Sequence, residues 1–429
     1  MTITTTRVPG VRRVTATLYG YAFLTDFVLL YPVYVLLFAD AGLSVGQISS
    51  LFVIWSASAI LLEVPSGAWA DAVSRRLLLC LAPLVTAAGF AVWVLLPSYP
   101  AFALGFLLWG AGAALGSGAL EALVFTELDR LGAAGRYARV MGRARTAGVV
   151  GAAASAPLAA PVLAAGGYPA VAAGGYPAVA AGSILACLLA AAVATRFPEH
   201  RDTDGGAGSD EDDLGWAASL RAGLAEARTV PTVRAAVLLV AAVAAGWGAL
   251  DEYTPLLARD TGLDTATVPL LLLLVWVGTT AGGLLAPAGE RLTTRGYAAL
   301  LCLGALTLAG GALTGHPAGF VLVAVAFGAF QLATVLADAR LQARISGPSR
   351  ATVTSLAGLA TDVTIIAVYA GYGLVASGAG NAVAFAAVAV PYLGVALLLI
   401  GRRRNRSRPR PAAEPAAVGD TAPATAPPA

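Results

Sequence analysis

The chain has 429 residues, of which 58% are hydrophobic and only 12% are charged, and its mean hydropathy is +0.78. Soluble domains carry about 25% charged residues, so this composition excludes a water-soluble protein and predicts an all-α membrane protein. All 27 basic residues are arginines, balanced by 24 acidic residues to a net charge of +3, which does not indicate a nucleic-acid partner.

A membrane-spanning helix needs ~20 mostly apolar residues, and about twelve stretches of the sequence meet this requirement. They lie at 15–38, 47–70, 77–96, 101–126, 146–166, 176–196, 233–256, 265–286, 297–315, 318–339, 352–375 and 380–400. The first stretch is long and lacks a small-residue cleavage site, so it predicts a retained helix and not a signal peptide.

A long polar segment divides the predicted spans into two groups. We expect a cytoplasmic N-terminal segment at 1–13, a six-helix bundle at 14–196, a cytoplasmic central loop at 197–232, a second six-helix bundle at 233–401 and a disordered cytoplasmic tail at 402–429. The central loop carries Trp216, Leu220 and Leu224 four residues apart, which predicts an amphipathic helix. This helix either lies at the membrane interface or packs beneath the bundles.

The arginines predict the orientation of the chain in the membrane. If the N-terminus is cytoplasmic, the arginines that flank the predicted spans fall on the cytoplasmic side, and Arg259 is the clear exception. Cytoplasmic loops of membrane proteins carry an excess of basic residues. We therefore expect a multi-pass protein of the inner or plasma membrane with both termini in the cytoplasm.

The two groups of spans resemble each other in sequence. The loop "GLSVGQI" at 42–48 recurs as "GLDTATV" at 262–268, and we expect Ser44 and Asp264 to cap the helices that follow. Two further spacings recur in the same order, Pro100 to Glu121 as Pro317 to Asp338 and Gly67 to Arg75 as Gly283 to Arg291. The three correspondences together indicate two parallel six-helix repeats. A tandem copy of "GGYPAVAA" over 166–181 is expected to lengthen an outer loop, because the sixth span needs only one copy.

The stretch "GAWADAVSRR" at 67–76 joins the second and third predicted spans. Its Gly67, Asp71, Arg75 and Arg76 match the loop G-x-L-A-D-R-x-G-R-R of the major facilitator superfamily, which the whole membrane region resembles. The resemblance implies twelve helices in two pseudo-repeats and transport by alternating access. We expect these four residues to form a cytoplasmic latch, in which the aspartate meets an arginine or a helix N-terminus. The alternative is that the two arginines only set the topology.

The fifth span contains a second partial match to the superfamily. Its antiporters resemble one another in a segment G-x-x-x-G-P-x-x-G-G, and "AAASAPLAAP" at 152–161 keeps Pro157 with alanine in place of glycine. This segment indicates the drug:proton antiporter type, although small residues also serve tight helix packing. Many proton-coupled members carry an arginine where this sequence has Phe106, so a proton relay through that arginine is excluded.

Acidic residues inside the apolar stretches are the candidates for proton coupling or solute binding. They are Asp26, Glu121 and Asp362 in first place, followed by Asp251 and Glu63. A charge at the membrane centre costs at least ~2.5–3.5 kcal/mol on insertion scales, and the sequence places no arginine at a similar depth. A carboxyl group in such surroundings favours its protonated form, so these acids are expected to bind and release protons.

Two of the acids leave alternatives open. Glu63 lies about one helical turn from Gly67, where a coupling role and a structural role fit equally well. Glu252 follows Asp251 directly, and it is expected either to border an outer gate or to face water.

Aromatic and amide side chains in the spans are candidates for lining a cavity, because aromatic faces bind cationic and lipophilic solutes. These candidates are Tyr31, Trp109, Trp247, Tyr253, Gln331 and Tyr369. The alternative for each is a packing or interfacial role.

Together these features predict a secondary active transporter with a small-molecule solute and protons as its partners. We expect proton-coupled efflux of small amphipathic or cationic compounds. The alternative is a proton symporter that imports a sugar or other small nutrient, and a remote alternative is a membrane scaffold or enzyme. No Gly-rich phosphate loop and no cluster of metal ligands occurs, so we expect no ATP, cofactor or catalytic activity, and a monomer in the lipid bilayer.

Overall fold

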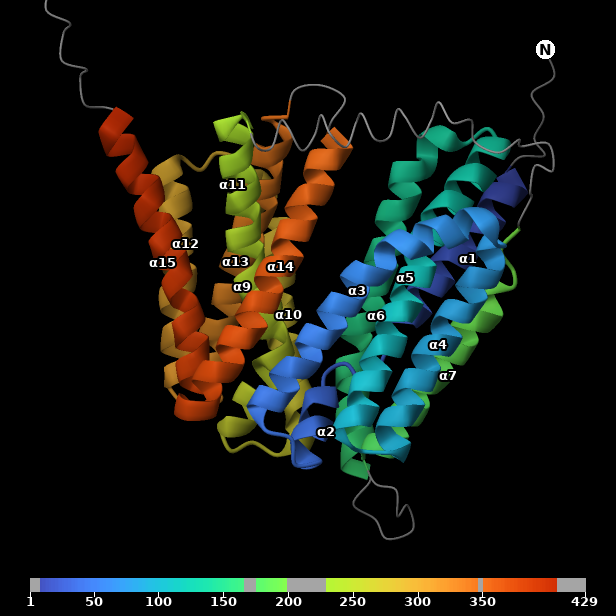
Figure 1. The fold of residues 1–429 in the computed structure, drawn as a ribbon, viewed down its shortest axis with the longest axis horizontal. Coiled ribbons are helices and arrows are strands. Elements are labelled where there is room, and N and C mark those ends of the chain that lie inside the picture. Colours follow the sequence, from blue (N-terminus) through green and yellow to red (C-terminus); the bar gives the residue numbers. More distant parts are fainter. Residues whose placement is uncertain (1–7, 166–174, 199–228, 346–349, 407–429) are drawn as a thin grey trace, which may run out of the picture.

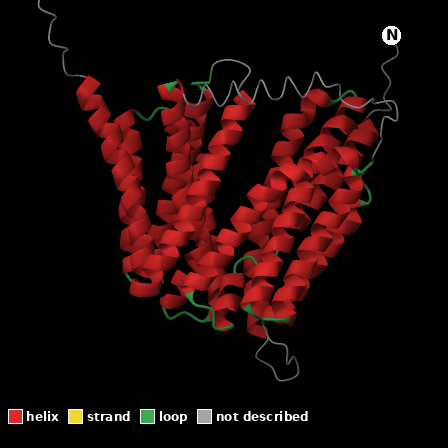
Figure 2. Ribbon diagram, viewed as in Figure 1, coloured by secondary structure: helices red, strands yellow, loops and turns green. Residues whose placement is uncertain are grey.

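The computed structural model describes residues 8–165, 175–198, 229–345 and 350–406, and all regular elements in these ranges are helical (Figure 1, Figure 2). The N-terminal bundle comprises α1 (Val8–Asp26), α2 (Tyr34–Asp40), α3 (Val45–Ala72), α4 (Arg75–Leu95), α5 (Tyr99–Arg130), α6 (Tyr137–Ala165) and α7 (Tyr176–Ala194). The C-terminal bundle comprises α9 (Pro231–Asp260), α10 (Val268–Leu284), α11 (Ala286–Gly289), α12 (Thr294–Leu313), α13 (Gly319–Gln342), α14 (Arg350–Ala379) and α15 (Asn381–Arg406). Short 3-10 turns, η2 (Ala134–Arg136) and η3 (Thr265–Thr267), precede α6 and α10.

Eleven helices in the described ranges are long and apolar enough to cross a membrane. The prediction of an all-helical multi-pass membrane protein is therefore confirmed. The predicted twelfth span, the first in the chain, is not among the eleven, so the number of spans stays a prediction.

The first predicted span is interrupted, and the expected continuous helix over 15–38 is wrong. The helix α1 ends at Asp26, and the chain turns irregularly before α2 begins. Pro32 cannot donate a backbone hydrogen bond and disfavours helical backbone at the residue before it. Within the interruption the N–H of Leu30 donates instead to Ser183 Oγ on α7, at 3.0 Å. A side chain of another helix thus satisfies a backbone group that the helix would have used.

The two bundles meet at one end of the molecule and diverge toward the other (Figure 1). The end with α2 is here called the α2 end, and the end where α1 begins and α15 ends is called the terminal end (Figure 1). Across the boundary, α3 packs against α14 and α6 packs against α10. Both ends of the described chain therefore lie at the end where the bundles separate, on opposite sides of the molecule (Figure 1).

Glycines permit a close helix contact in the C-terminal bundle, between α10 and α13. A methyl group at Gly278 would lie 2.2 Å from the carbonyl oxygen of Ala324, and one at Gly282 would lie 2.0 Å from that of Gly328. Small residues at such spacing let helix backbones approach in membranes. Any side chain at Gly282 would force the two helices apart.

Several predicted boundaries change in the structure. Ser44 caps α3 as expected, accepting from the N–H of Gln47 at 3.3 Å, whereas Asp264 makes no side-chain cap bond, so that prediction is wrong. The helix α15 continues to Arg406, beyond the predicted start of the tail. The second "GGYPAVAA" copy supplies the start of α7, and the predicted amphipathic helix at 216–224 lies outside the described residues.

Candidate functional site

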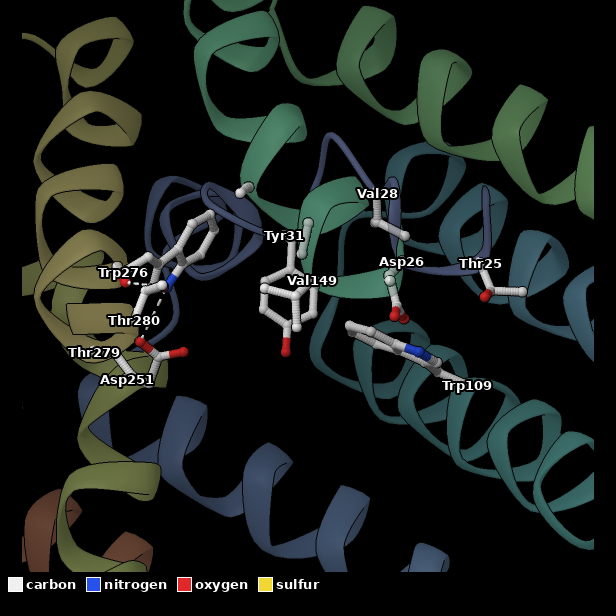
Figure 3. Close-up of a pocket in the computed structure, with 13 residues that line it drawn as sticks. Thr25, Asp26, Val28, Tyr31, Trp109, Val149, Asp251, Trp276, Thr279 and Thr280 are labelled. Carbon is white, nitrogen blue, oxygen red and sulfur yellow. Dashed lines mark hydrogen bonds between the residues drawn. The ribbon is translucent and has the colours of Figure 1, made fainter. Parts of the chain in front are cut away.

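A cavity of about 380 Å³ lies between the two bundles (Figure 3). Its lining comes from α1, the segment after α1, α5 and α6 on one side and from α9 and α10 on the other. The lining residues are Thr25, Asp26, Val28, Tyr31, Trp109, Gly148, Val149, Ala152, Ala153, Asp251, Trp276, Thr279 and Thr280. Five of the helices that flank the boundary therefore contribute to a single site.

Asp26 is the acidic side chain that the N-terminal bundle presents to the cavity. It is the last residue of α1, so the irregular segment that follows keeps its surroundings open. Its carboxylate lies against α6, because a methyl group at Gly148 would lie 2.1 Å from Asp26 Oδ2. Within the described residues no arginine forms an ion pair with Asp26. The carboxylate therefore faces the cavity with no cationic partner among the described residues.

Asp251 is the acidic side chain that the C-terminal bundle presents to the cavity. Its Oδ1 accepts a hydrogen bond from Trp276 Nε1 at 3.3 Å, drawn in Figure 3. One turn further along α10, the hydroxyls of Thr279 and Thr280 donate to carbonyl oxygens of their own helix, at 3.1 and 2.8 Å. Each threonine hydroxyl keeps its oxygen lone pairs to accept from a bound molecule.

Aromatic rings form much of the remaining wall. Tyr31 packs edge-on against Trp109 of its own bundle, with ring centroids 5.9 Å apart, and against Trp276 of the other bundle at 6.4 Å. In Figure 3 its ring lies between the two labelled acids, Asp26 and Asp251. Trp55 stacks on Trp109 with ring centroids 5.1 Å apart and helps to hold that indole in place. The cavity is thus a slot with aromatic walls and a carboxylate from each bundle.

The cavity is closed at the α2 end by an interbundle seam. The seam consists of Tyr34, Asp40 and Ser49 from the N-terminal bundle and Glu252, Tyr253 and Arg259 from the C-terminal bundle. The Tyr34 hydroxyl donates to Glu252 Oε2, Tyr253 donates to Ser49 Oγ at 2.8 Å, and Arg259 Nη1 lies 2.7 Å from Asp40 Oδ1.

Glu252 lies deep in this seam and only 8% of it is exposed. The expectation that it faces water is therefore wrong. The helix α9 packs against α2. This packing places Glu252 beside Tyr34 of α2, which donates a hydrogen bond to it.

Two of the acids that the sequence favoured do not line the cavity. Glu121 is more than half exposed on α5 and lies 3.9 Å from Arg145 on α6. The expectation that no arginine lies near these acids is therefore wrong for Glu121. Asp362 is half-buried on α14, and neither residue is among the described lining residues.

The other cavity candidates occupy different positions. Tyr31 and Trp109 line the cavity, whereas Tyr253 belongs to the seam. Three further candidates lie outside the lining. Trp247 donates to Thr334 Oγ1 at 3.1 Å, Gln331 packs beside Gly283, and Tyr369 packs on Phe52 with centroids 5.2 Å apart.

The predicted latch can be placed only in part. The side chains of Glu63, Gly67 and Asp71 lie outside the described residues. Arg75 Nη1 donates to Thr126 Oγ1 on α5 at 3.1 Å, and Arg76 is exposed. Arg75 thus contacts a helix of its own bundle.

Sequence reasoning missed Trp276 and the cavity threonines. The signal was present in "VWVGTT" at 275–280, an indole and two hydroxyls inside an otherwise leucine-rich span. The sequence does not show that these side chains lie on the face of their helix that points toward Asp251, and the structure does.

The fold and the cavity together define a class of protein. Two helical bundles that enclose a polar and aromatic cavity at their boundary, closed at one end, have the architecture of a membrane transporter. Residues 16–360 match the Major Facilitator Superfamily, and the chain belongs to this family. It is therefore a transporter of that superfamily and not an enzyme.

Solved structures of transporters share the fold. The nucleoside transporter NupG is 12% identical with a TM-score of 0.71, over 92% of this chain and 100% of that one. An inward-facing, unoccupied bacterial homologue of the human lysosomal transporter Spinster is 17% identical with a TM-score of 0.71, over 96% and 100%. A D-xylose–proton symporter is 17% identical with a TM-score of 0.65, over 91% and 96%. No curated protein matches the sequence.

Proposed function

We propose that this protein is a secondary transporter that exports small amphipathic or cationic compounds in exchange for protons. The observation that carries this proposal is the cavity itself. Its described lining holds a carboxylate from each bundle and three aromatic rings, and it includes no arginine. Such a lining attracts a positively charged, partly apolar molecule.

The exchange of solute for protons follows from the state of Asp26. A carboxylate in apolar surroundings needs a counter-charge or a proton. A solute cation and a proton satisfy that need equally, and they exclude each other at the same oxygen atoms. Competition at Asp26 therefore makes release of one the condition for binding of the other, which is the requirement for antiport.

The orientation of the chain determines which side the cavity serves. Among the described arginines, Arg259 is at the α2 end, and the others are near the ends of helices at the terminal end. The positive-inside rule then favours a cytoplasmic terminal end, in the plasma or inner membrane. In that orientation the seam closes the outer side, and the cavity receives solute from the cytoplasm. Two similar Spinster homologue structures are also described as inward-facing.

A proton symporter that imports a sugar or similar nutrient is the second candidate. The hydroxyls of Thr25, Thr279 and Thr280 in the lining favour it, because a neutral polyol needs hydrogen-bond partners. A D-xylose–proton symporter is among the similar structures. The two candidates differ in the charge of the solute and in the direction of coupled flux.

Flux in proteoliposomes tests both candidates. With ethidium as the cationic probe, an imposed pH gradient is expected to drive exchange in the wild type. Asp26→Asn, which keeps the side-chain volume but loses the charge, is expected to lower this flux at least about tenfold, because one charge-assisted contact is worth ~1.5–3 kcal/mol. Asp264→Asn, an exposed loop residue without a cap bond, is the matched control and is expected to keep wild-type flux.

Two results would contradict the exporter. If Asp26→Asn carried ethidium at the wild-type rate, the charge of Asp26 would not be needed for transport. Proton-coupled uptake of a neutral pentose, with no flux of the cation, would replace the exporter by the symporter.

A further inference from the structure

Two consecutive acids on α9, Asp251 and Glu252, point into different parts of the molecule. Neighbouring residues on an α-helix point about 100° apart, so Asp251 reaches the cavity and Glu252 reaches the interbundle seam. The cavity does not account for Glu252, which is not among its described lining residues. A buried acid between two bundles that must separate therefore needs its own explanation.

Among the residues that the structure describes, the surroundings of Glu252 contain hydrogen-bond donors but no cation. The ionisable groups that interact with it are Asp251 and Tyr253 on α9, Tyr34 on α2, Tyr31 on the segment before α2, and Tyr369 on α14. The Tyr34 hydroxyl is its hydrogen-bond partner. Arg259, two turns further along the helix, pairs with Asp40.

The charge of Glu252 therefore affects how firmly the seam closes. Burial of an ionised carboxylate without a cation is strongly unfavourable, because the charged group loses its hydration. A protonated carboxyl group avoids that cost and still accepts from Tyr34. When the bundles separate at the α2 end, water solvates the ionised form. Protonation thus stabilises the closed seam, and ionisation favours the open one.

The seam is also in contact with the cavity. The ring of Tyr34 packs edge-on against Trp109 at 6.0 Å and against Tyr31 at 6.3 Å, and both of these residues line the cavity. Asp251, adjacent to Glu252, binds a cavity residue, Trp276. A cation that occupies the cavity is therefore close to Glu252 and favours its ionised form.

We propose that Glu252 is the proton-binding residue that sets whether the interbundle seam is open or closed. In the open state a carboxylate oxygen of Glu252 takes a proton from water at the α2 end. The seam then closes around the neutral acid. When a cation binds in the cavity, the O–H bond breaks, the proton leaves to cavity water, and the seam opens. The assignment rests on the proposed exchange of a cation for protons.

The test measures the seam directly and needs no transported solute. In a chain whose Cys80, Cys187 and Cys302 are replaced by alanine, spin labels at Ala41→Cys and Asp264→Cys report the separation of the bundles at the α2 end by electron paramagnetic resonance. In the wild type the open fraction is expected to rise with pH. A single titrating group changes the ratio by at most about tenfold per pH unit.

Two variants have opposite expected outcomes. Glu252→Gln is neutral at every pH and still accepts from Tyr34, so its label distance is expected to stay short throughout. Tyr34→Phe removes a hydrogen bond that holds the closed seam together in both protonation states of Glu252, so opening is expected at lower pH than in the wild type. Glu290→Gln, an exposed acid near the terminal end, is the matched control and is expected to open as the wild type does.

A wild-type pH response in Glu252→Gln would overturn the assignment of Glu252. A pH-independent wild-type distance would overturn it as well. Because the labels report conformation, these failures are distinct from failure of the proposed transport. If the seam responds to pH through Glu252 but ethidium is not carried, the solute class is wrong and the assignment of Glu252 stands.

Discussion

At the scale of single residues, Gly148 shows how tightly the helix α6 packs against Asp26. The backbone of α6 passes so near Asp26 that a methyl group at Gly148 would lie 2.1 Å from the carboxylate oxygen. Because the atom in the way is the end of a side chain, the expected consequence is displacement of the acid and not collapse of the fold.

Gly148→Ala is therefore expected to weaken binding of a cationic solute while the fold persists. The expected loss is about tenfold, which corresponds to ~1.4 kcal/mol for a displaced charged contact. The measurement is the dissociation constant of ethidium, followed by fluorescence. Gly142→Ala on the same helix, where a methyl group meets nothing within 4 Å, serves as control. Equal affinity in both variants would show that the position of Asp26 does not determine binding.

Arg259 is another residue whose role becomes clear from its contact. In the sequence it is the exception to the positive-inside pattern, and in the structure it pairs with Asp40 across the seam at 2.7 Å. Tyr176 donates to the same carboxylate at 2.6 Å. The pair is partly exposed, so its expected contribution is only ~0–1 kcal/mol. Its position indicates that the pair aligns the bundles at the exposed edge of the seam, while the contact between Glu252 and Tyr34 is buried inside the seam.

At the scale of elements, the glycines between α10 and α13 determine how the C-terminal bundle packs. Both helices approach backbone to backbone at Gly282 and Gly328. Here the atom in the way is a carbonyl oxygen, which cannot rotate aside. A substitution at this contact has to move a whole helix.

Gly282→Ala is expected to destabilise the bundle by about 1–3 kcal/mol, the usual cost of overpacking. The apparent unfolding temperature in detergent is expected to fall by several degrees, roughly 2–10 °C. Gly371→Ala on α14, where a methyl group meets nothing within 4 Å, is expected to unfold at the wild-type temperature. An unchanged unfolding temperature in Gly282→Ala would mean that the two helices are not held at this separation.

At the scale of the whole molecule, the bundles meet at the α2 end and diverge toward the terminal end (Figure 1). The seam residues join the bundles where they meet. An inward-facing state therefore requires that the terminal end face the cytoplasm, and this requirement is testable.

Labelling of single cysteines with a membrane-impermeant maleimide tests the orientation in intact cells. In the cysteine-free chain, Ala41→Cys near α2 is expected to react from outside. Ala343→Cys, exposed just after α13, is expected to react only after the cells are permeabilised. The reverse pattern would place the seam on the cytoplasmic side and make the described state outward-facing.

The sequence by itself determined the membrane class, the helical content and the approximate ends of most spans. These features depend on local composition, because ~20 apolar residues have few alternatives to a membrane helix. The sequence also identified Asp26, Asp251, Tyr31 and Trp109, because a polar or bulky aromatic side chain inside an apolar span is conspicuous.

Only the tertiary structure decided which of these side chains share a cavity. Glu121 and Glu252 look alike in the sequence, yet one pairs with Arg145 near the surface and the other is buried against Tyr34. The interruption after α1 likewise depends on Ser183, which is 153 residues away along the chain. The direction of a side chain around its helix, and the group that a neighbouring helix presents to it, are set by packing between distant segments, and local sequence does not encode that packing.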